Sequence, residues 1–179
     1  MISNRTRKVI LTSLSIILIA AALAWAATEA DIAAHPHCVI CGMDRLKFAH
    51  SRMLVTYDDD TEVGYCSIHC VAVDNAANLD RVPVRMQVGH YDSRQLIDAE
   101  KAAWVIGGDR PGVMTKVAKW AFARASEAKR FIQKNGGRMG DMEVAMKASY
   151  EDMYADTKMI REKRKMMRAK KMKPGHGHE

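Results

Sequence analysis

The 179-residue sequence is poor in aromatic residues, which make up only 6% of the chain. Its 28 lysines and arginines outnumber its 21 acidic residues, but much of the excess lies between Lys158 and Lys173, where Glu162 is the only acid. Proteins that bind single-stranded nucleic acid combine a basic groove with aromatic side chains on which the bases stack. A basic segment without aromatic residues offers no such surface, so the composition argues against a nucleic-acid partner.

Cysteine is absent outside one stretch, from Cys38 to Cys70, which contains all four thiols of the chain. The thiols form two close pairs, Cys-x-x-Cys ending at Cys41 and Cys-x-x-x-Cys starting at Cys66. Two such pairs can surround a tetrahedral ion, and thiolates prefer Zn, Cu(I) or iron-sulfur clusters over hard cations. The pattern therefore favours a soft-metal site. Further candidate donors lie beside the pairs: His35, His37, Met43 and His69.

Two other interpretations of the cysteines stay open. In an oxidising compartment they could form two disulfides, although a bridge within either pair would close a very small loop and add little stability. They could also form a redox pair, but no strand pattern precedes Cys38 and no amphipathic helix pattern follows Cys41, as such a motif requires. The spacing favours metal binding over both.

The first 30 residues have the pattern of an export signal. Three basic residues near the start precede an uncharged apolar run from Val9 to Ala27, and Ala24-Trp25-Ala26 resembles a cleavage site. The run is also long enough to span a bilayer as an uncleaved anchor. Residues 1–30 are therefore predicted to be a signal peptide or an N-terminal anchor in the inner membrane. Either form sends the following residues across the membrane, so we expect an exported, periplasmic protein.

The residues after the first cysteine pair predict a hairpin followed by a helix. Segments 52–57 and 61–66 alternate as strands around the aspartate-rich turn at residues 58–60. Ser67 is a candidate N-cap for a helix from Ile68 to about Asn78. This unit is expected to bring Cys66 and Cys70, one helical turn apart, next to the first pair.

A second strand-strand-helix unit is expected downstream. Its strands are predicted at Val82–Val88 and Ala102–Ile106, and its helix at Glu127–Asn135, capped by Ser126 and ended by glycines. The expected fold class is α+β, with two small lobes in a metal-binding domain of residues 35–137.

Residues 138–179 are predicted to form a methionine-rich, basic and amphipathic helical tail. Methionines at positions 142, 146 and 153 recur at helical spacing. Such a stripe is more typical of a packing surface than of a row of metal ligands. The basic end of the tail is a candidate for contact with a membrane surface, because lysine and arginine are attracted to anionic headgroups.

Several short blocks between His37 and Gly137 resemble the NosL family, the exported copper chaperones associated with maturation of nitrous oxide reductase. The blocks occur in the order found in that family: Cys41-Gly42-Met43, Leu96-Ile97-Asp98-Ala99, Ala103-Trp104-Val105-Ile106-Gly107, Gly112-Val113-Met114, Ala121-Phe122 and Phe131 through Gly137. The two cysteine pairs around the hairpin also resemble the small metal-binding knuckles called TRASH or YHS-like domains.

The resemblance implies Cu(I) binding by Cys41, Met43 and Met114, in two related α+β lobes similar to the organomercurial lyase core. Thiolate and thioether are soft donors suited to Cu(I). Three further thiols are not part of the family's Cys-x-Met pattern: Cys38, Cys66 and Cys70. They are expected either to enlarge this site or to form a site of their own. Family members are commonly lipidated at a processed cysteine, whereas no cysteine precedes Cys38 in this chain.

Two functions are consistent with these residues. The first is a metallochaperone that carries Cu(I) and passes it to a recipient copper protein outside the cytoplasm. The alternative is a structural zinc module, in which four thiolates close around the ion and the protein binds a partner without metal transfer. No enzymatic turnover is expected in either case.

Overall fold

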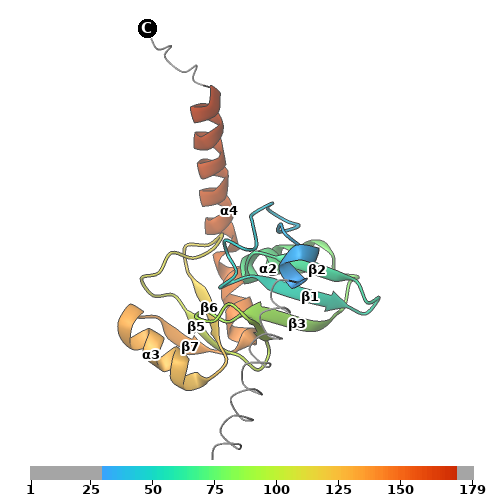
Figure 1. Cartoon of the computed structure of the whole chain (residues 1–179). Helices are drawn as coiled ribbons and strands as arrows, with labels where there is room; N and C mark the ends of the chain where they lie inside the picture. Colours follow the sequence, from blue (N-terminus) through green and yellow to red (C-terminus); the bar gives the residue numbers. More distant parts are fainter. Residues whose placement is uncertain (1–29, 173–179) are drawn as a thin grey trace, which may run out of the picture.

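The computed structural model describes residues 30–172 and contains two antiparallel sheets lying side by side, with a long C-terminal helix between and beyond them (Figure 1). This arrangement confirms the expected α+β class and the C-terminal helix. The predicted signal or anchor segment lies outside the described residues, apart from residue 30.

The first sheet has the strand order β2-β1-β3-β4. Its strands are β1 (Met53–Tyr57), β2 (Glu62–Tyr65), β3 (Pro83–Gly89) and β4 (Leu96–Asp98). The predicted hairpin is confirmed, because β1 and β2 pair across a turn in which Asp60 has a φ of 61°. Aspartate is among the residues that adopt this left-handed conformation most readily. Helix α2 (Ile68–Ala77) follows β2 almost directly, as predicted.

The second sheet has the order β6-β5-β7. Its strands are β5 (Ala103–Ile106), β6 (Lys119–Phe122) and β7 (Arg138–Gly140). Helix α3 (Ala125–Asn135) packs on this sheet. The helix begins earlier than predicted: Arg124 is the N-cap, and its backbone N–H donates to the Glu127 carboxylate at 3.0 Å. A glutamate three residues after the cap fixes the start of a helix in this way, so the prediction of Ser126 as the cap was wrong.

One strand belongs to a different lobe from the one predicted. The strand expected at Val82–Val88 to open the second unit is β3, and it pairs with β1 in the first sheet. Alternation of apolar and polar residues identifies a strand but not its neighbour. The second lobe consequently consists of β5, β6 and α3, and β7 completes its sheet.

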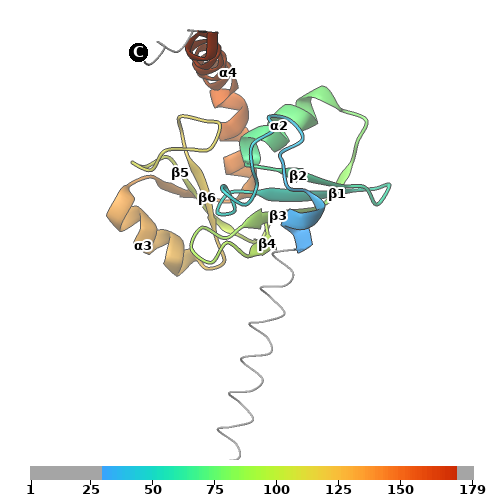
Figure 2. The ribbon, with the colours of Figure 1, turned by 45° about the horizontal axis from the view of Figure 1, so that its top comes forward.

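Helix α4 (Met142–Met172) packs its first half against α2 and β5 and then leaves the body of the protein. Figure 2 shows the second half projecting from both lobes, and residues 161–170 are all exposed. Among residues 30–172, no helix is both long and apolar enough to cross a membrane.

A buried ion-pair cluster joins the segment before the first cysteine pair to the first sheet. Asp31 accepts hydrogen bonds from Arg45 at 2.8 Å and from Arg52, and both guanidinium groups are fully buried. Arg45 also donates to the backbone carbonyls of Asp31, His35, Met53 and Tyr65. One side chain therefore holds the cysteine-bearing loop against β1 and the end of β2.

Candidate metal centre

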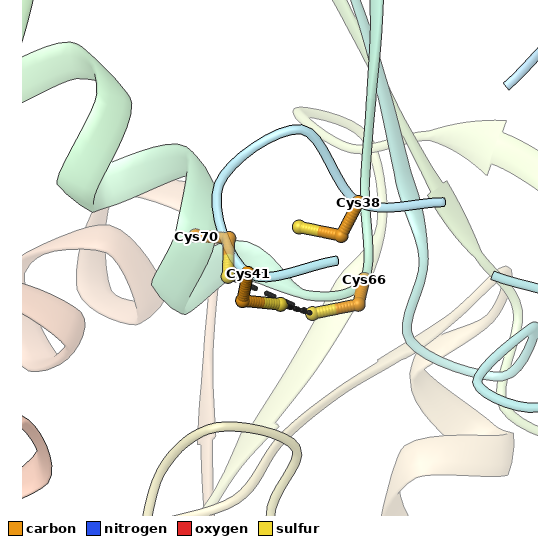
Figure 3. Close-up of side chains that lie close together, drawn as sticks. All are labelled: Cys38, Cys41, Cys66 and Cys70. Carbon is orange, nitrogen blue, oxygen red and sulfur yellow. Dashed lines mark hydrogen bonds between the residues drawn. The ribbon is translucent and has the colours of Figure 1, made fainter. Parts of the chain in front are cut away.

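The four cysteines converge from three places in the chain. Cys38 and Cys41 lie on the loop before β1, Cys66 follows β2, and Cys70 lies in the first turn of α2. All are free thiols, and their sulfur atoms lie within 4.8 Å of one another. The Cys66 sulfur is 3.5 Å from that of Cys41 and 3.6 Å from that of Cys70 (Figure 3). Tetrahedral Zn–S bonds of about 2.3 Å place sulfur atoms about 3.8 Å apart, so this spacing suits a metal ion.

The loop from Cys38 to Met43 is closed by its own backbone. The N–H of Cys38 donates to the Met43 carbonyl at 2.9 Å, and the N–H of Gly42 donates to the Cys38 carbonyl at 2.8 Å. Gly42 has a φ of +75°, which glycine adopts without a steric penalty. The turn thus directs the Cys38 and Cys41 sulfurs toward one centre (Figure 3).

Ser67 connects the cysteine cluster to the loop that carries Met114. Ser67 is the N-cap residue of α2, as predicted, but its hydroxyl makes no capping bond and instead donates to the Val113 carbonyl at 3.0 Å. Met114, the next residue, has a φ of 62°. Non-glycine residues in this region are strained, and such strain is concentrated at functional sites. The N–H of Lys116 donates to Asp156 of α4 at 2.9 Å, which fixes the other end of this loop.

The thiols influence each other's ionisation. Contact with Cys41, followed by contacts with Cys66 and Cys70, lowers the pKa of Cys38. The contact with Cys38 raises the pKa of Cys41, but contacts with Cys66 and Cys70 outweigh it and lower this pKa overall. The pKa values of Cys66 and Cys70 are raised, chiefly by their contacts with Cys38 and Cys41 and also by burial. The cluster resists losing all four protons by itself, and a bound cation removes that resistance.

Cys41 also belongs to a cavity of about 440 Å³ beside the cluster. Met43 and Met114 line the same cavity, so the structure brings together the three residues to which the resemblance assigned Cu(I). The other three cysteines are buried behind Cys41, which is partly exposed. Cys41 is therefore common to a four-thiol cluster and to a thioether-lined cavity.

Two methionines that the sequence did not single out line this cavity: Met159 and Met167 of α4. They are more than 40 residues from Met114 in the chain, and the methionines noted in the sequence lie nearer the start of the helix. The four-residue steps from Met159 to Met167 place both on one face of α4. That spacing was the available signal, but it does not identify what the face contacts.

The candidate histidine donors stand apart from the thiol cluster. Among the described residues, the only Cys, His, Asp or Glu group able to hold a metal consists of the four cysteines. His69 is buried, and its Nδ1 lies 3.3 Å from Oδ2 of Asp156 on α4. Burial lowers the pKa of His69, so the ring is neutral at neutral pH and the contact is not a full ion pair. His69 of α2 therefore lies against Asp156 of α4, beside the cluster.

Comparison with known proteins gives a family match and a similar solved structure. The model of the NosL family matches residues 29–149. No curated protein matches the sequence. One similar solved structure is the crystal structure of the copper chaperone NosL from Shewanella denitrificans. Its sequence is 20% identical to this one, the match covers 60% of this chain and 87% of that chain, and the TM-score is 0.47.

Proposed function

The chain belongs to the NosL family, and from this we propose that it is an exported metallochaperone that carries Cu(I) to an extracytoplasmic copper enzyme. The observation that carries the proposal is the position of Cys41, which belongs both to the thiol cluster and to the methionine-lined cavity. A protein that transfers a metal needs a site with enough affinity to take the ion from one partner. The same site must leave the ion accessible to the next partner. A buried thiol cluster with one partly exposed member meets both needs.

In this proposal Cu(I) is cargo, held by Cys41, Met43 and Met114, with Cys38, Cys66 and Cys70 as further thiolate donors. Soft donors retain a soft ion, and the thioether has no proton to lose on binding. Transfer proceeds by ligand exchange, in which a donor of the recipient enters through the cavity as one donor of this chain leaves. Copper remains Cu(I), so the protein performs no turnover chemistry.

Metal analysis of anaerobically purified protein tests this assignment. We expect copper in the wild-type protein and less copper in Cys41→Ser and Met114→Leu, because each variant removes a soft donor from the cavity. Met139→Leu is a matched control, since Met139 lies on β7 and does not line the cavity. Undiminished copper in both cavity variants would refute the Cu(I) assignment.

A structural zinc site is the second candidate function, and the burial of three thiols favours it. Structural zinc sites are closed and four-coordinate, whereas sites that exchange ligands keep an open position. In this case the ion would hold the first lobe together, and the cavity would serve another purpose. The two candidates differ in whether the metal-free protein folds.

We further propose that the exposed half of α4 contacts anionic membrane surfaces. Each lysine or arginine near such a surface contributes about 1 kcal/mol of attraction. Replacing Arg161, Lys165 and Arg168 with glutamine should therefore reduce binding to anionic vesicles at low salt on the order of 100-fold. Cosedimentation measures this, with exposed basic residues of α3 replaced as a charge-matched control: Lys129, Arg130 and Lys134. Equal binding by the two triple variants would exclude the role of α4.

A further inference from the structure

One face of α4 lines one side of the methionine-lined cavity. Met159, Lys163 and Met167 follow one another at four-residue intervals, so their side chains form a single row along the helix. All three line the cavity that contains Cys41 and Met114. This part of α4 lies beyond residue 149, where the match to the NosL family ends. The chain therefore adds its own wall to the cavity beside the candidate metal centre.

The soft donors of the cavity lie at different depths. Met167 is 58% exposed, whereas Met159 and Met114 are half-buried. Cys41 is partly exposed and lies beside the three buried cysteines. An ion arriving from solvent would meet Met167 at the rim before it reached the thiols. The order of exposure thus gives the cavity an outer and an inner end.

Building on the proposed copper function, we propose that Met114, Met159 and Met167 form an outer Cu(I) site that shares Cys41 with the four-thiol cluster. Three thioethers and one thiol from three separate segments surround this space. The outer site receives the ion, and the thiol cluster retains it.

The chemistry of the donors sets the direction of transfer and the choice of metal. Thioethers are neutral soft donors, so they bind Cu(I) but contribute little affinity for Zn(II). Thiolates are anionic, and they hold the ion more strongly than thioethers do. As Cu(I) moves inward, each Cu–thioether bond that breaks is replaced by a Cu–thiolate bond, and the thiol proton passes to water. The metal is neither oxidised nor reduced.

Positive charges at the rim of the cavity also favour movement of Cu(I) from the outer site to the thiol cluster. Lys163 and Arg164 also line the cavity. Their positive charges oppose a cation that remains at the outer site. The outer site is therefore suited to brief occupancy, and the four-thiol cluster to retention.

Anaerobic titration with Cu(I) against a chromophoric Cu(I) chelator tests the outer site in the full-length protein. We expect the wild-type protein to bind one Cu(I) tightly and a second more weakly. The Met159→Leu/Met167→Leu variant should keep the first ion. The affinity of this double variant for the second Cu(I) should fall by at least about 10-fold. Loss of an outer-shell partner of a metal ligand alone usually costs about that much.

The matched control is Met166→Leu, because Met166 is 63% exposed on the same helix and does not line the cavity. It should bind both ions like the wild-type protein. Absence of any Cu(I) binding by the wild-type protein would overturn the proposed function itself. Binding of a single ion by the wild-type protein, or of two equally well by the double variant, would overturn only the outer site.

Zn(II) titration supplies a second readout. The double variant should bind Zn(II) as the wild-type protein does, because its thiols are unchanged. A parallel loss of Zn(II) affinity would overturn the outer site, since it would show that α4 supports the thiol cluster and does not bind copper itself.

Discussion

Replacing Arg45 with methionine is expected to lower the free energy of unfolding of the metal-free protein by about 3–5 kcal/mol, the usual cost of removing one partner from a buried ion pair. The fully buried Arg45 guanidinium pairs with the Asp31 carboxylate and donates to four backbone carbonyls. Methionine has a similar length but no donor, so these acceptors lose their partner while remaining away from water. Each buried acceptor left without a donor adds to the loss.

Urea denaturation followed by circular dichroism measures this effect. Unfolding free energies of small proteins change by about 1–3 kcal/mol per molar urea, so the midpoint should fall by about 1 M or more. Arg85→Met is the matched control, because Arg85 is exposed on β3 of the same sheet. A midpoint within experimental error of that control would show that the cluster does not hold the loop.

The whole buried cluster can also be replaced, to separate the ion pairs from the carbonyl contacts. Complete replacement of a buried ion cluster by apolar side chains is often neutral or stabilising. Here we expect Asp31→Leu/Arg45→Met/Arg52→Met to recover only part of the loss, because the carbonyls that bond to Arg45 remain without donors. Full recovery would mean that these carbonyl contacts contribute nothing.

The parts of the centre that are close in sequence could be predicted from the sequence alone. Alternating residues indicated the hairpin, and Ser67 marked the start of α2. These features lie within about 33 residues, so local geometry was enough to predict that the four thiols converge. The pairing of β3 with β1 was not predictable in this way, because alternation carries no information about the neighbouring strand.

The remaining parts depend on how distant elements dock. The cavity exists because α4 packs against α2 and the second lobe, where Asp156 meets His69 and Asp152 pairs with Lys119. Helical spacing indicates which residues share a face of α4, but not what that face meets. Arg45 gave no signal at all, since nothing in its sequence context distinguishes a buried arginine from an exposed one. Both features require the tertiary structure.

The first lobe has metal-independent contacts that position Cys66. The hydroxyls of Tyr65 and Tyr57 donate to the Asp74 carboxylate at 2.7 and 3.0 Å, and so join the hairpin to α2. Tyr65 immediately precedes Cys66, whose carbonyl accepts a hydrogen bond from Ser51 at 2.9 Å. A lobe held in this way differs from a small zinc finger, which has no stable fold without its metal. The thiol cluster is therefore expected to be preformed.

Cys66→Ser is expected to abolish tight binding of both Cu(I) and Zn(II), with a loss of affinity of about 100-fold or more, because outer-shell changes alone cost about 10–100-fold. The Cys66 sulfur lies closest to two other thiols of the cluster, and a serine hydroxyl is a poor donor for a soft ion. Competition titrations measure the affinities. Cys41→Ser is the variant to compare with it, because Cys41 belongs both to the thiol cluster and to the cavity. Metal binding by Cys66→Ser that equals the wild-type protein would show that the cluster is not the centre.

The same variant separates transfer from a structural role when its fold is compared with that of chelator-treated wild-type protein. If copper is cargo, both metal-free proteins should retain backbone hydrogen-exchange protection in β1, β2 and α2, because Arg45, Tyr57 and Tyr65 hold these elements without a metal. Added metal should then raise wild-type stability only by the amount that its affinity and concentration dictate. If zinc is structural, protection in the first lobe should collapse in both proteins while the second lobe remains protected. A preformed cluster permits an ion to leave without unfolding the protein that carried it, and reversible transfer depends on that property.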